Sequence, residues 1–378
     1  MIETSLRIES FGGTLFDLNS GKRIYLNHDE VLKIKDNTIE FDNYQFKPPF
    51  NIIKPNKLPT NGFSFADTAF IELTRKCNLR CKHCLNDSGK ELGLLLSDDE
   101  IKKLIVDLSK SGLQEIRFTG GEPLLHKCIF EFIELCTNCG MRASIGTNGT
   151  LITEEIAQKL KDSGLKYAVI SIDGTENAHD NIRGSGNYKK AFNGIKNLQN
   201  VGIRIRINSV LMKNNTSDII ELMKELNSKH ISAFIRRFIT SGRGDGQHSE
   251  VLTKEDYDNV RQQLENELQD KFIKGHYLND ELIKPRIELP FERYSCSAGQ
   301  RGLVILPNGN IHTCGFLAAQ GERPLMNIRR VDNWTNFWND MVDKNPLQNL
   351  RDELVVYNKK PNVQPTNCLA YVSYKLKE

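Results

Sequence analysis

Three cysteines lie close together within eight residues of the chain: Cys77, Cys81 and Cys84. Thiolates at this spacing can bind one face of a [4Fe-4S] cubane and leave one iron without a protein ligand. The amine and carboxylate of a small molecule can chelate such an open iron. A structural zinc site normally needs a fourth ligand at a similar spacing, and only His83 lies in the segment. The spacing therefore favours a cluster over a zinc ion or inert thiols.

A glycine pair followed by a carboxylate lies further along the chain, in Thr119-Gly120-Gly121-Glu122-Pro123. Glycine lets the backbone approach a ligand closely, and Glu122 offers an acceptor for an ammonium group. Alone, this pattern is typical of a turn. It follows the strand after the one that precedes the cysteines, so we expect both motifs on the same rim of the fold.

A second group of cysteines lies near the end of the sequence, at Cys296, Cys314 and Cys368. Two short apolar segments flank Asn308-Gly309, which predicts a hairpin. Cysteines at either end of a hairpin can face each other and bind a cluster, and the alternative is that these cysteines are buried without a ligand. The chain has nine cysteines, and this odd number argues against a disulfide framework and for a reducing cytoplasm.

The segments that must position these residues alternate between strands and helices from about residue 66. Strands are expected at Phe70–Thr74, Glu115–Thr119, Met141–Ile145, Tyr167–Ile172, Arg204–Met212 and Ala233–Ile239. Helices are expected at 97–112, His126–Cys139, Glu154–Ser163, Tyr188–Val201, Asp218–Ser228 and Thr253–Ile273. Six such units predict a closed or nearly closed barrel, in which chemistry takes place at the carboxyl ends of the strands.

The sequence predicts three regions. Residues 1–65 contain two expected β segments, Ser5–Phe16 and Lys22–Ile34, followed by a proline-rich linker at 48–60. Residues 66–285 form the barrel, and residues 286–378 form the module that holds the second cysteine group.

The composition is that of an ordinary globular protein. Lys and Arg total 51 against 48 Asp and Glu, a net charge of +3, so nothing indicates binding to nucleic acid or an anionic membrane. The first residues lack a signal-peptide pattern, and no apolar run is long enough to span a membrane. We therefore expect a cytoplasmic protein.

With Thr147-Asn148-Gly149 and Ser171-Ile172-Asp173-Gly174 added, the set of motifs resembles the radical S-adenosylmethionine (SAM) superfamily over residues 66–245. The resemblance implies an α/β fold with a partial (β/α)6 TIM-like barrel, a [4Fe-4S] cluster on the first three cysteines, and bound SAM. It implies that His83 packs against the adenine and that Gly121 and Glu122 contact the methionine amine. Ser171 and Arg183 match positions that bind the methionine carboxylate and the ribose; the alternatives are a strand-end cap and a solvated loop charge.

The C-terminal hairpin resembles the start of a SPASM or Twitch module, which carries auxiliary iron–sulfur clusters. The sequence departs from the full SPASM pattern because only Cys368 follows Cys314. We therefore expect a Twitch-like hairpin module with one auxiliary cluster on Cys296, Cys314 and Cys368. A non-cysteine ligand, water or substrate would complete it.

The resemblance implies an oxidoreductase or maturase in which an electron donor such as flavodoxin or ferredoxin reduces the cluster. SAM is then cleaved to a 5′-deoxyadenosyl radical that abstracts hydrogen from substrate. The opening segment around Phe11-Gly12-Gly13 resembles the start of peptide maturases, which favours a ribosomally made peptide as substrate. The alternatives are a small-molecule dehydrogenase or cofactor-biosynthesis enzyme, and a non-catalytic iron–sulfur redox protein. The motifs assign no catalytic acid or base.

Four arginines occupy expected strand positions that alternate with apolar residues: Arg117, Arg204, Arg206 and Arg237. They could line the barrel and bind an anionic substrate, or they could pair with acidic groups in a polar interior.

Overall fold

The computed structural model gives the positions of most of the chain. The described residues are 3–34, 39–41, 44–59, 62–90, 93–268, 272–273, 277–278, 296–361, 363, 366 and 368–377. The expected domain boundary at residues 285–286 lies outside them.

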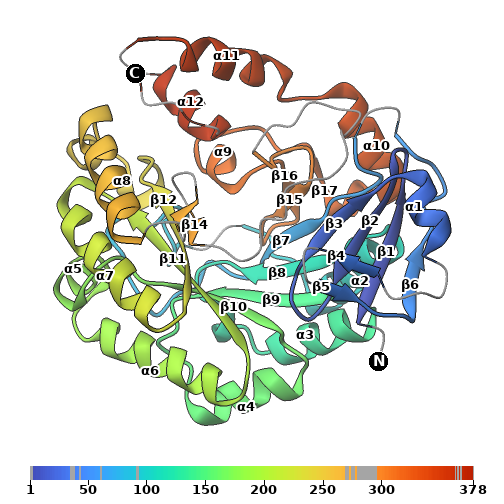
Figure 1. The fold of residues 1–378 in the computed structure, drawn as a ribbon, viewed down its shortest axis with the longest axis horizontal. Helices are drawn as coiled ribbons and strands as arrows, with labels where there is room; N and C mark the ends of the chain where they lie inside the picture. Colours follow the sequence, from blue (N-terminus) through green and yellow to red (C-terminus); the bar gives the residue numbers. More distant parts are fainter. Residues whose placement is uncertain are drawn as a thin grey trace.

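Six parallel strands form an arc with helices on its outer side (Figure 1). The strands are β7 (Thr68–Glu72), β8 (Glu115–Thr119), β9 (Arg142–Thr147), β10 (Tyr167–Ser171), β11 (Arg204–Leu211) and β12 (Ser232–Arg237). The helices between and after them are α2 (Asp98–Lys110), α3 (Ile129–Asn138), α4 (Glu154–Asp162), α5 (Glu176–Arg183), α6 (Asn187–Asn200), α7 (Thr216–Ser228) and α8 (Lys254–Leu268). The expected partial (β/α)6 barrel is confirmed.

Side chains alternate between the two faces of each barrel strand. One face, which includes Ile116, Phe118 and Ile170, is fully buried in the main apolar core with residues of the surrounding helices. The opposite, inner face carries half-buried side chains such as Phe70, Arg117 and Ser171. The inner face is therefore the surface on which this barrel presents polar groups.

Local capping explains where several helices begin and end. Ser97 accepts from Glu100 N, and the Glu100 side chain accepts from Ser97 N, which is the expected capping box at the start of α2. Helix α5 was not predicted; it has only eight residues and is followed by Gly184, whose φ of 103° favours glycine. Helix α8 covers Lys254–Leu268, and Phe272–Ile273, which were expected at the end of this helix, form a short strand instead.

The N-terminal region is a separate four-stranded sheet with the order β3-β2-β1-β6. Its elements are β1 (Thr4–Glu9), β2 (Gly12–Asp17), β3 (Arg23–Leu26), α1 (His28–Lys33) and β6 (Phe50–Ile53), with a hairpin of β4 (Ile39–Phe41) and β5 (Tyr44–Phe46). Two expectations were wrong. A capping box between Asn27 and Glu30 makes the end of the second β segment helical, and the proline-rich linker contains β6, which pairs in parallel with β1.

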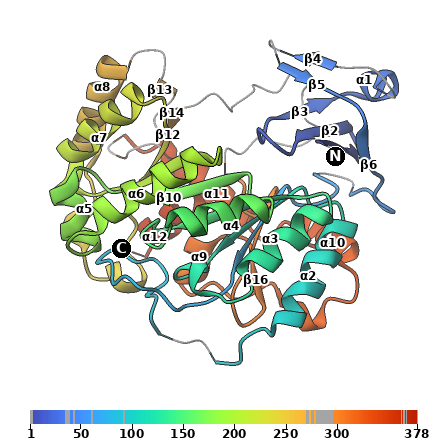
Figure 2. The same ribbon diagram turned by 90° about the horizontal axis from the view of Figure 1, so that it is seen from below.

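The N-terminal sheet lies to one side of the barrel in Figure 2, and a buried arginine joins the two. Arg7 is fully buried; its Nε donates to Glu9 Oε1 at 2.7 Å and its Nη2 to Asp67 Oδ1 at 2.8 Å. Its Nη1 also donates to the carbonyl of Gly112, which follows α2. Breaking a buried pair on one side costs several kcal/mol, so the sheet is firmly attached.

The C-terminal region continues the barrel sheet. Strand β15 (Gly302–Ile305) pairs in parallel with β7, and β16 (Asn310–His312) pairs with β15 in the expected hairpin. The remaining elements are β17 (Met326–Asn327), α9 (Gly315–Ala319), α10 (Trp334–Lys344), α11 (Gln348–Asn358) and α12 (Leu369–Lys375). Strand β14 (Tyr277–Leu278) pairs with β12 on one side and with β13 (Phe272–Ile273) on the other. The pairing with β7 was not anticipated.

Candidate active site

The first cysteine group occupies the loop directly after β7. Cys81 is buried, while Cys77 and Cys84 are half-buried. Leu79 N donates to Cys77 Sγ and Ser88 N donates to Cys84 Sγ, each at 3.4 Å. Burial, with a smaller contribution from neighbouring thiols of the same loop, raises the pKa of Cys77 and Cys81. The loop therefore brings three thiols together, and backbone N–H groups donate to two of them.

A segment after β12 holds this cysteine loop in place. Arg243 N donates to the Cys84 carbonyl at 2.9 Å, and its Nη1 donates to the Cys81 carbonyl at 3.0 Å. A Cβ on Gly242 would lie 2.2 Å from the Leu85 carbonyl oxygen, so only glycine permits this approach. This contact could not be predicted from the sequence, because nothing local marks residues distant in the chain as partners.

The Gly-Gly-Glu-Pro loop lies against the residues just before Cys77. Gly121 N donates to the Thr74 carbonyl at 2.7 Å, and Glu122 N donates to the Lys76 carbonyl at 2.8 Å. A Cβ on Gly121 would lie 2.1 Å from the Lys76 carbonyl oxygen. The glycine pair therefore allows a close backbone approach, and this approach is to the cysteine loop. The two motifs do share one rim.

Glu122 is fully buried. Its carboxylate accepts from Thr147 Oγ1 at 2.7 Å, Asn148 N at 2.9 Å and Leu124 N at 3.2 Å. Burial raises the pKa of Glu122 to about 7, and these three hydrogen bonds only partly oppose the rise. Two residues of the Thr147-Asn148-Gly149 motif thus hold the Glu122 side chain in place.

A buried carboxylate links two of the predicted site residues. Asp173 Oδ2 lies 2.6 Å from His83 Nε2 and 2.6 Å from Arg183 Nε. Its Oδ1 accepts from Val210 N at 2.8 Å. Burial opposes ionisation, but Arg183 and His83 outweigh it and hold the pKa of Asp173 well below its usual range. The sequence did not predict a role for Asp173 itself, although this residue lies in the Ser171-Ile172-Asp173-Gly174 motif.

The other predicted ligand residues take different positions. Ser171 is half-buried on the inner face and pairs in register with Asn208. Arg183 Nη1 donates to Cys81 Sγ at 3.7 Å and is buried, so it is not a solvated loop charge. His83 Nδ1 is buried and finds no hydrogen-bond partner among the described residues.

The sequence profile of the radical SAM superfamily matches residues 71–226. The AdoMet-dependent heme synthase of Methanosarcina barkeri (strain Fusaro) is 31% identical over 268 residues, which cover 65% of this chain and 76% of that protein. The chain belongs to the radical SAM superfamily. It is a radical SAM enzyme, and the family implies a [4Fe-4S] cluster and SAM as cofactors.

Two further comparisons bear on this radical SAM enzyme. The Fe-coproporphyrin III synthase of the same organism is 36% identical over 207 residues, covering 53% of this chain and about half, 52%, of that relative. The crystal structure of Streptococcus suis SuiB bound to precursor peptide SuiA is 17% identical, with a TM-score of 0.68 over 96% of this chain and 98% of that one. The second likeness shows the fold.

The residues of this radical SAM chain fit the implied cluster. Among the described residues, no group of three or more His, Cys, Asp or Glu is arranged to hold a single metal ion. A cubane is larger than an ion and needs thiols spread over its face. The cysteine loop offers three such thiols, and backbone N–H groups and the Arg183 guanidinium lie where thiolates would be stabilised.

The second cysteine group also comes together. Cys296, Cys314 and Cys368 pack against one apolar cluster with α11 and α12. Burial, together with the nearby thiols of Cys296 and Cys368, raises the pKa of Cys314 to about 12. Residues far apart in the sequence thus form one group of thiols beside the barrel.

The four predicted arginines separate into different environments. Arg117 Nη2 pairs with Glu115 Oε1 at 3.0 Å, as expected for a polar interior, and Arg206 lies over the Tyr167 ring. Arg204 is exposed and donates to the Ser20 carbonyl. Arg204 therefore does not line the barrel.

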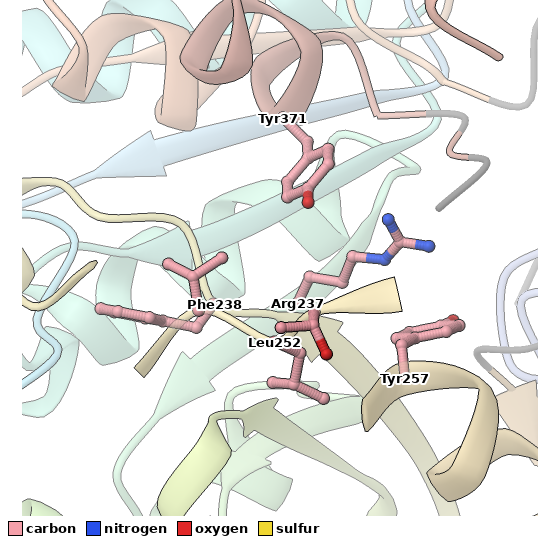
Figure 3. Close-up of a pocket in the computed structure, with 7 residues that line it drawn as sticks. Arg237, Phe238, Leu252, Tyr257 and Tyr371 are labelled. Atoms are coloured by element: carbon pink, nitrogen blue, oxygen red, sulfur yellow. The ribbon is translucent and has the colours of Figure 1, made fainter. Parts of the chain in front are cut away.

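The fourth arginine lies in a small pocket outside the barrel, and Figure 3 shows its side chain between two tyrosine rings. The Arg237 guanidinium carbon lies 4.2 Å from the Tyr257 ring centroid and 5.2 Å from that of Tyr371. Tyr371 belongs to α12, which begins after Cys368. The stacked arginine thus joins the barrel to the helix that follows Cys368.

Within the part of the chain that the structure describes, no helix is both long and apolar enough for a membrane span.

Proposed function

We propose that this radical SAM enzyme binds its cluster through Cys77, Cys81 and Cys84 and modifies a ribosomally made peptide. The cofactor site rests on one observation, the direct backbone pairing of the Gly-Gly-Glu-Pro loop with the residues before Cys77. When bound, the reduced cluster supplies the electron that cleaves SAM, and SAM supplies the hydrogen-abstracting radical.

The buried Glu122 suits the methionine ammonium of SAM. Burial disfavours its charged form, and an incoming cation would favour that form by direct attraction. Gly121 would lie beside the amine. Ser171 on the inner face would bind the carboxylate or ribose with Arg183, and His83 would face the adenine. Asp173 holds Arg183 and His83 in place.

A peptide substrate is supported by the N-terminal sheet. Among the described residues, β3 and β6 each pair on one side only, so both present backbone groups to which an extended peptide can add. SuiB, whose fold matches nearly the whole chain, is bound to a precursor peptide in its crystal structure. We assign residues 1–65 to this role and residues 66–285 to the barrel.

The C-terminal residues 286–378 would form a SPASM- or Twitch-like module with one auxiliary cluster on Cys296, Cys314 and Cys368. The convergence of these thiols supports this assignment. A flavodoxin or ferredoxin would supply electrons.

A second candidate is a small-molecule substrate, because two relatives are named as synthases of heme and of Fe-coproporphyrin III. Hydrogen–deuterium exchange distinguishes the two. Peptides encoded near the gene would be added to anaerobic, cluster-loaded enzyme, and binding should slow exchange of amides in β3 or β6. The bound peptide should then lose mass as hydrogen when SAM and a reductant are present. Unchanged exchange, combined with 5′-deoxyadenosine release stimulated by a tetrapyrrole, would reject the peptide.

A further inference from the structure

The most buried thiol of the cysteine loop accepts from a charged donor. Arg183 Nη1 donates to Cys81 Sγ at 3.7 Å. The sulfur atoms of Cys77 and Cys84 accept from neutral backbone N–H groups instead. Cys81 and Arg183 are each only 8% exposed, so water screens their contact little. Because charge-assisted hydrogen bonds are stronger than neutral ones, Cys81 receives the strongest of these three contacts.

Helix α5 fixes the position of the Arg183 guanidinium. Lys82 N donates to the Ile182 carbonyl at 2.9 Å, which joins the end of the helix to the cysteine loop. Asn187 Nδ2 donates to the Arg183 carbonyl at 3.0 Å, and Arg183 Nε donates to Asp173 Oδ2 at 2.6 Å. Backbone and side-chain contacts therefore both hold Arg183 beside the thiol.

Asp173 places the opposite charge at the same point. Its carboxylate is fully buried and lies against both Arg183 and His83. Burial raises the pKa of Cys81; Arg183 acts to lower this pKa, and Asp173 acts to raise it. The two buried charges thus both act on one sulfur atom, with opposite sign.

Reduction makes an iron–sulfur cluster more negative. One electron from the carrier enters the cluster, whose net charge falls by one unit, while no bond forms or breaks and no proton moves. Hydrogen bonds and charges at the ligand sulfurs set the potential of this step. A cationic donor stabilises the reduced form more than the oxidised form, and a buried carboxylate does the reverse.

We propose that Arg183 raises the reduction potential of the cluster through its hydrogen bond to Cys81, and that Asp173 limits this rise. The inference deepens the proposed function, on which it rests, because it gives Arg183 a role in electron uptake as well as at SAM. Arg183 acts through a ligand of the cluster, so its effect on the potential should be present before SAM binds.

Redox titration of anaerobic, cluster-loaded enzyme without SAM tests this proposal, with electron paramagnetic resonance as the readout. Arg183→Met should make the cluster about tenfold harder to reduce, a fall of about 59 mV in the midpoint potential of a one-electron couple. Asp173→Asn should raise the potential, because Arg183 then lacks its opposing charge. The matched control is Lys82→Gln, which removes a charge next to Cys81 in the chain. The Lys82 side chain is exposed, so solvent screens it and the potential should change little.

An unchanged or higher potential in Arg183→Met would overturn the proposal, as would an equal fall in Lys82→Gln. A fall in Asp173→Asn would also overturn it, since general loosening of the loop would then explain both variants. The midpoint does not depend on the fraction of protein that holds a cluster, so partial loss of iron leaves it measurable. If Arg183→Met binds no iron, Arg183→Gln takes its place, and its neutral donor should give a smaller fall.

The signal to be titrated is the one that disappears when Cys77, Cys81 and Cys84 are replaced together by alanine. If no signal disappears in that triple variant, the proposed cluster site fails, whatever the potentials show. If the signal disappears there but Arg183→Met titrates like the wild type, only the effect of Arg183 on the potential is rejected.

Discussion

The Nη1 atom of Arg183 lies 3.7 Å from the Sγ atom of Cys81. Asp173 accepts a hydrogen bond from the same guanidinium. Asp173 also binds His83, which belongs to the cysteine loop. Helix α5, the end of β10 and the cysteine loop are therefore joined through one buried carboxylate. Because Asp173 is fully buried, this junction depends on charge pairing that water cannot replace.

Replacement of Asp173 by asparagine should lower the free energy of unfolding by about 3 kcal/mol, because the buried Arg183 loses its partner charge. Urea denaturation of the cluster-free protein measures this change. Adding Arg183→Met to Asp173→Asn should recover part of the loss, since no unpaired cation then remains. A single variant as stable as the wild type would show that the pair is not important for the fold.

The two cysteine groups should bind iron independently. Replacing Cys77, Cys81 and Cys84 together by alanine should remove about half of the iron from anaerobically reconstituted protein. Replacing Cys296, Cys314 and Cys368 should remove the other half while leaving 5′-deoxyadenosine release detectable. Iron and sulfide analysis provides the measurement, and full iron content in either triple variant contradicts the ligand assignment.

Arg243→Ala should loosen the cysteine loop, because two loop carbonyls lose the donors of its side chain. At about 1 kcal/mol for each hydrogen bond, we expect iron to transfer to a chelator about tenfold faster or more. The control is Arg261→Ala, which removes an exposed pair with Glu265 on α8. Equal release rates in both variants would mean that Arg243 does not hold the loop.

Glu115 should make the free energy of unfolding depend on pH in the acid range. Burial opposes its ionisation, but Arg142 and Arg117 outweigh burial and lower the pKa of Glu115 from 4.5 to about 2. The folded state therefore gains about 3 kcal/mol above pH 4.5, and this gain is lost as the pH falls towards 2. Glu115→Gln should be less stable near neutrality, and the difference should shrink in acid.

Urea unfolding at a series of pH values tests this dependence. Glu131→Gln, which removes an exposed pair with Lys102, should change stability little at any pH. A constant difference between wild type and Glu115→Gln across the acid range would contradict the lowered pKa.

Most of the barrel could be predicted because local signals were strong. The strand at Glu115–Thr119 and the capping box at Ser97 occur as expected. The cysteine and Gly-Gly-Glu-Pro motifs could be placed on one rim because parallel strands present their carboxyl ends together. The helical end of the second β segment was missed because its apolar residues also suit a strand.

Contacts between distant segments could not be predicted. Asp173 looks like an ordinary turn residue after a strand, and its partners His83 and Arg183 become neighbours only when the barrel closes. The same holds for Arg243, which lies beyond the sixth strand but binds the first loop.

The parallel pairing of β15 with β7 has a consequence for biosynthesis. Thr68 is opposite Gly302, so the first barrel strand gains this neighbour only after most of the chain has left the ribosome. Until then, one border of the sheet offers unpaired backbone groups to other nascent chains. The segment that carries the second thiols thereby also closes the exposed border of the barrel, and a truncated polypeptide would be prone to self-association.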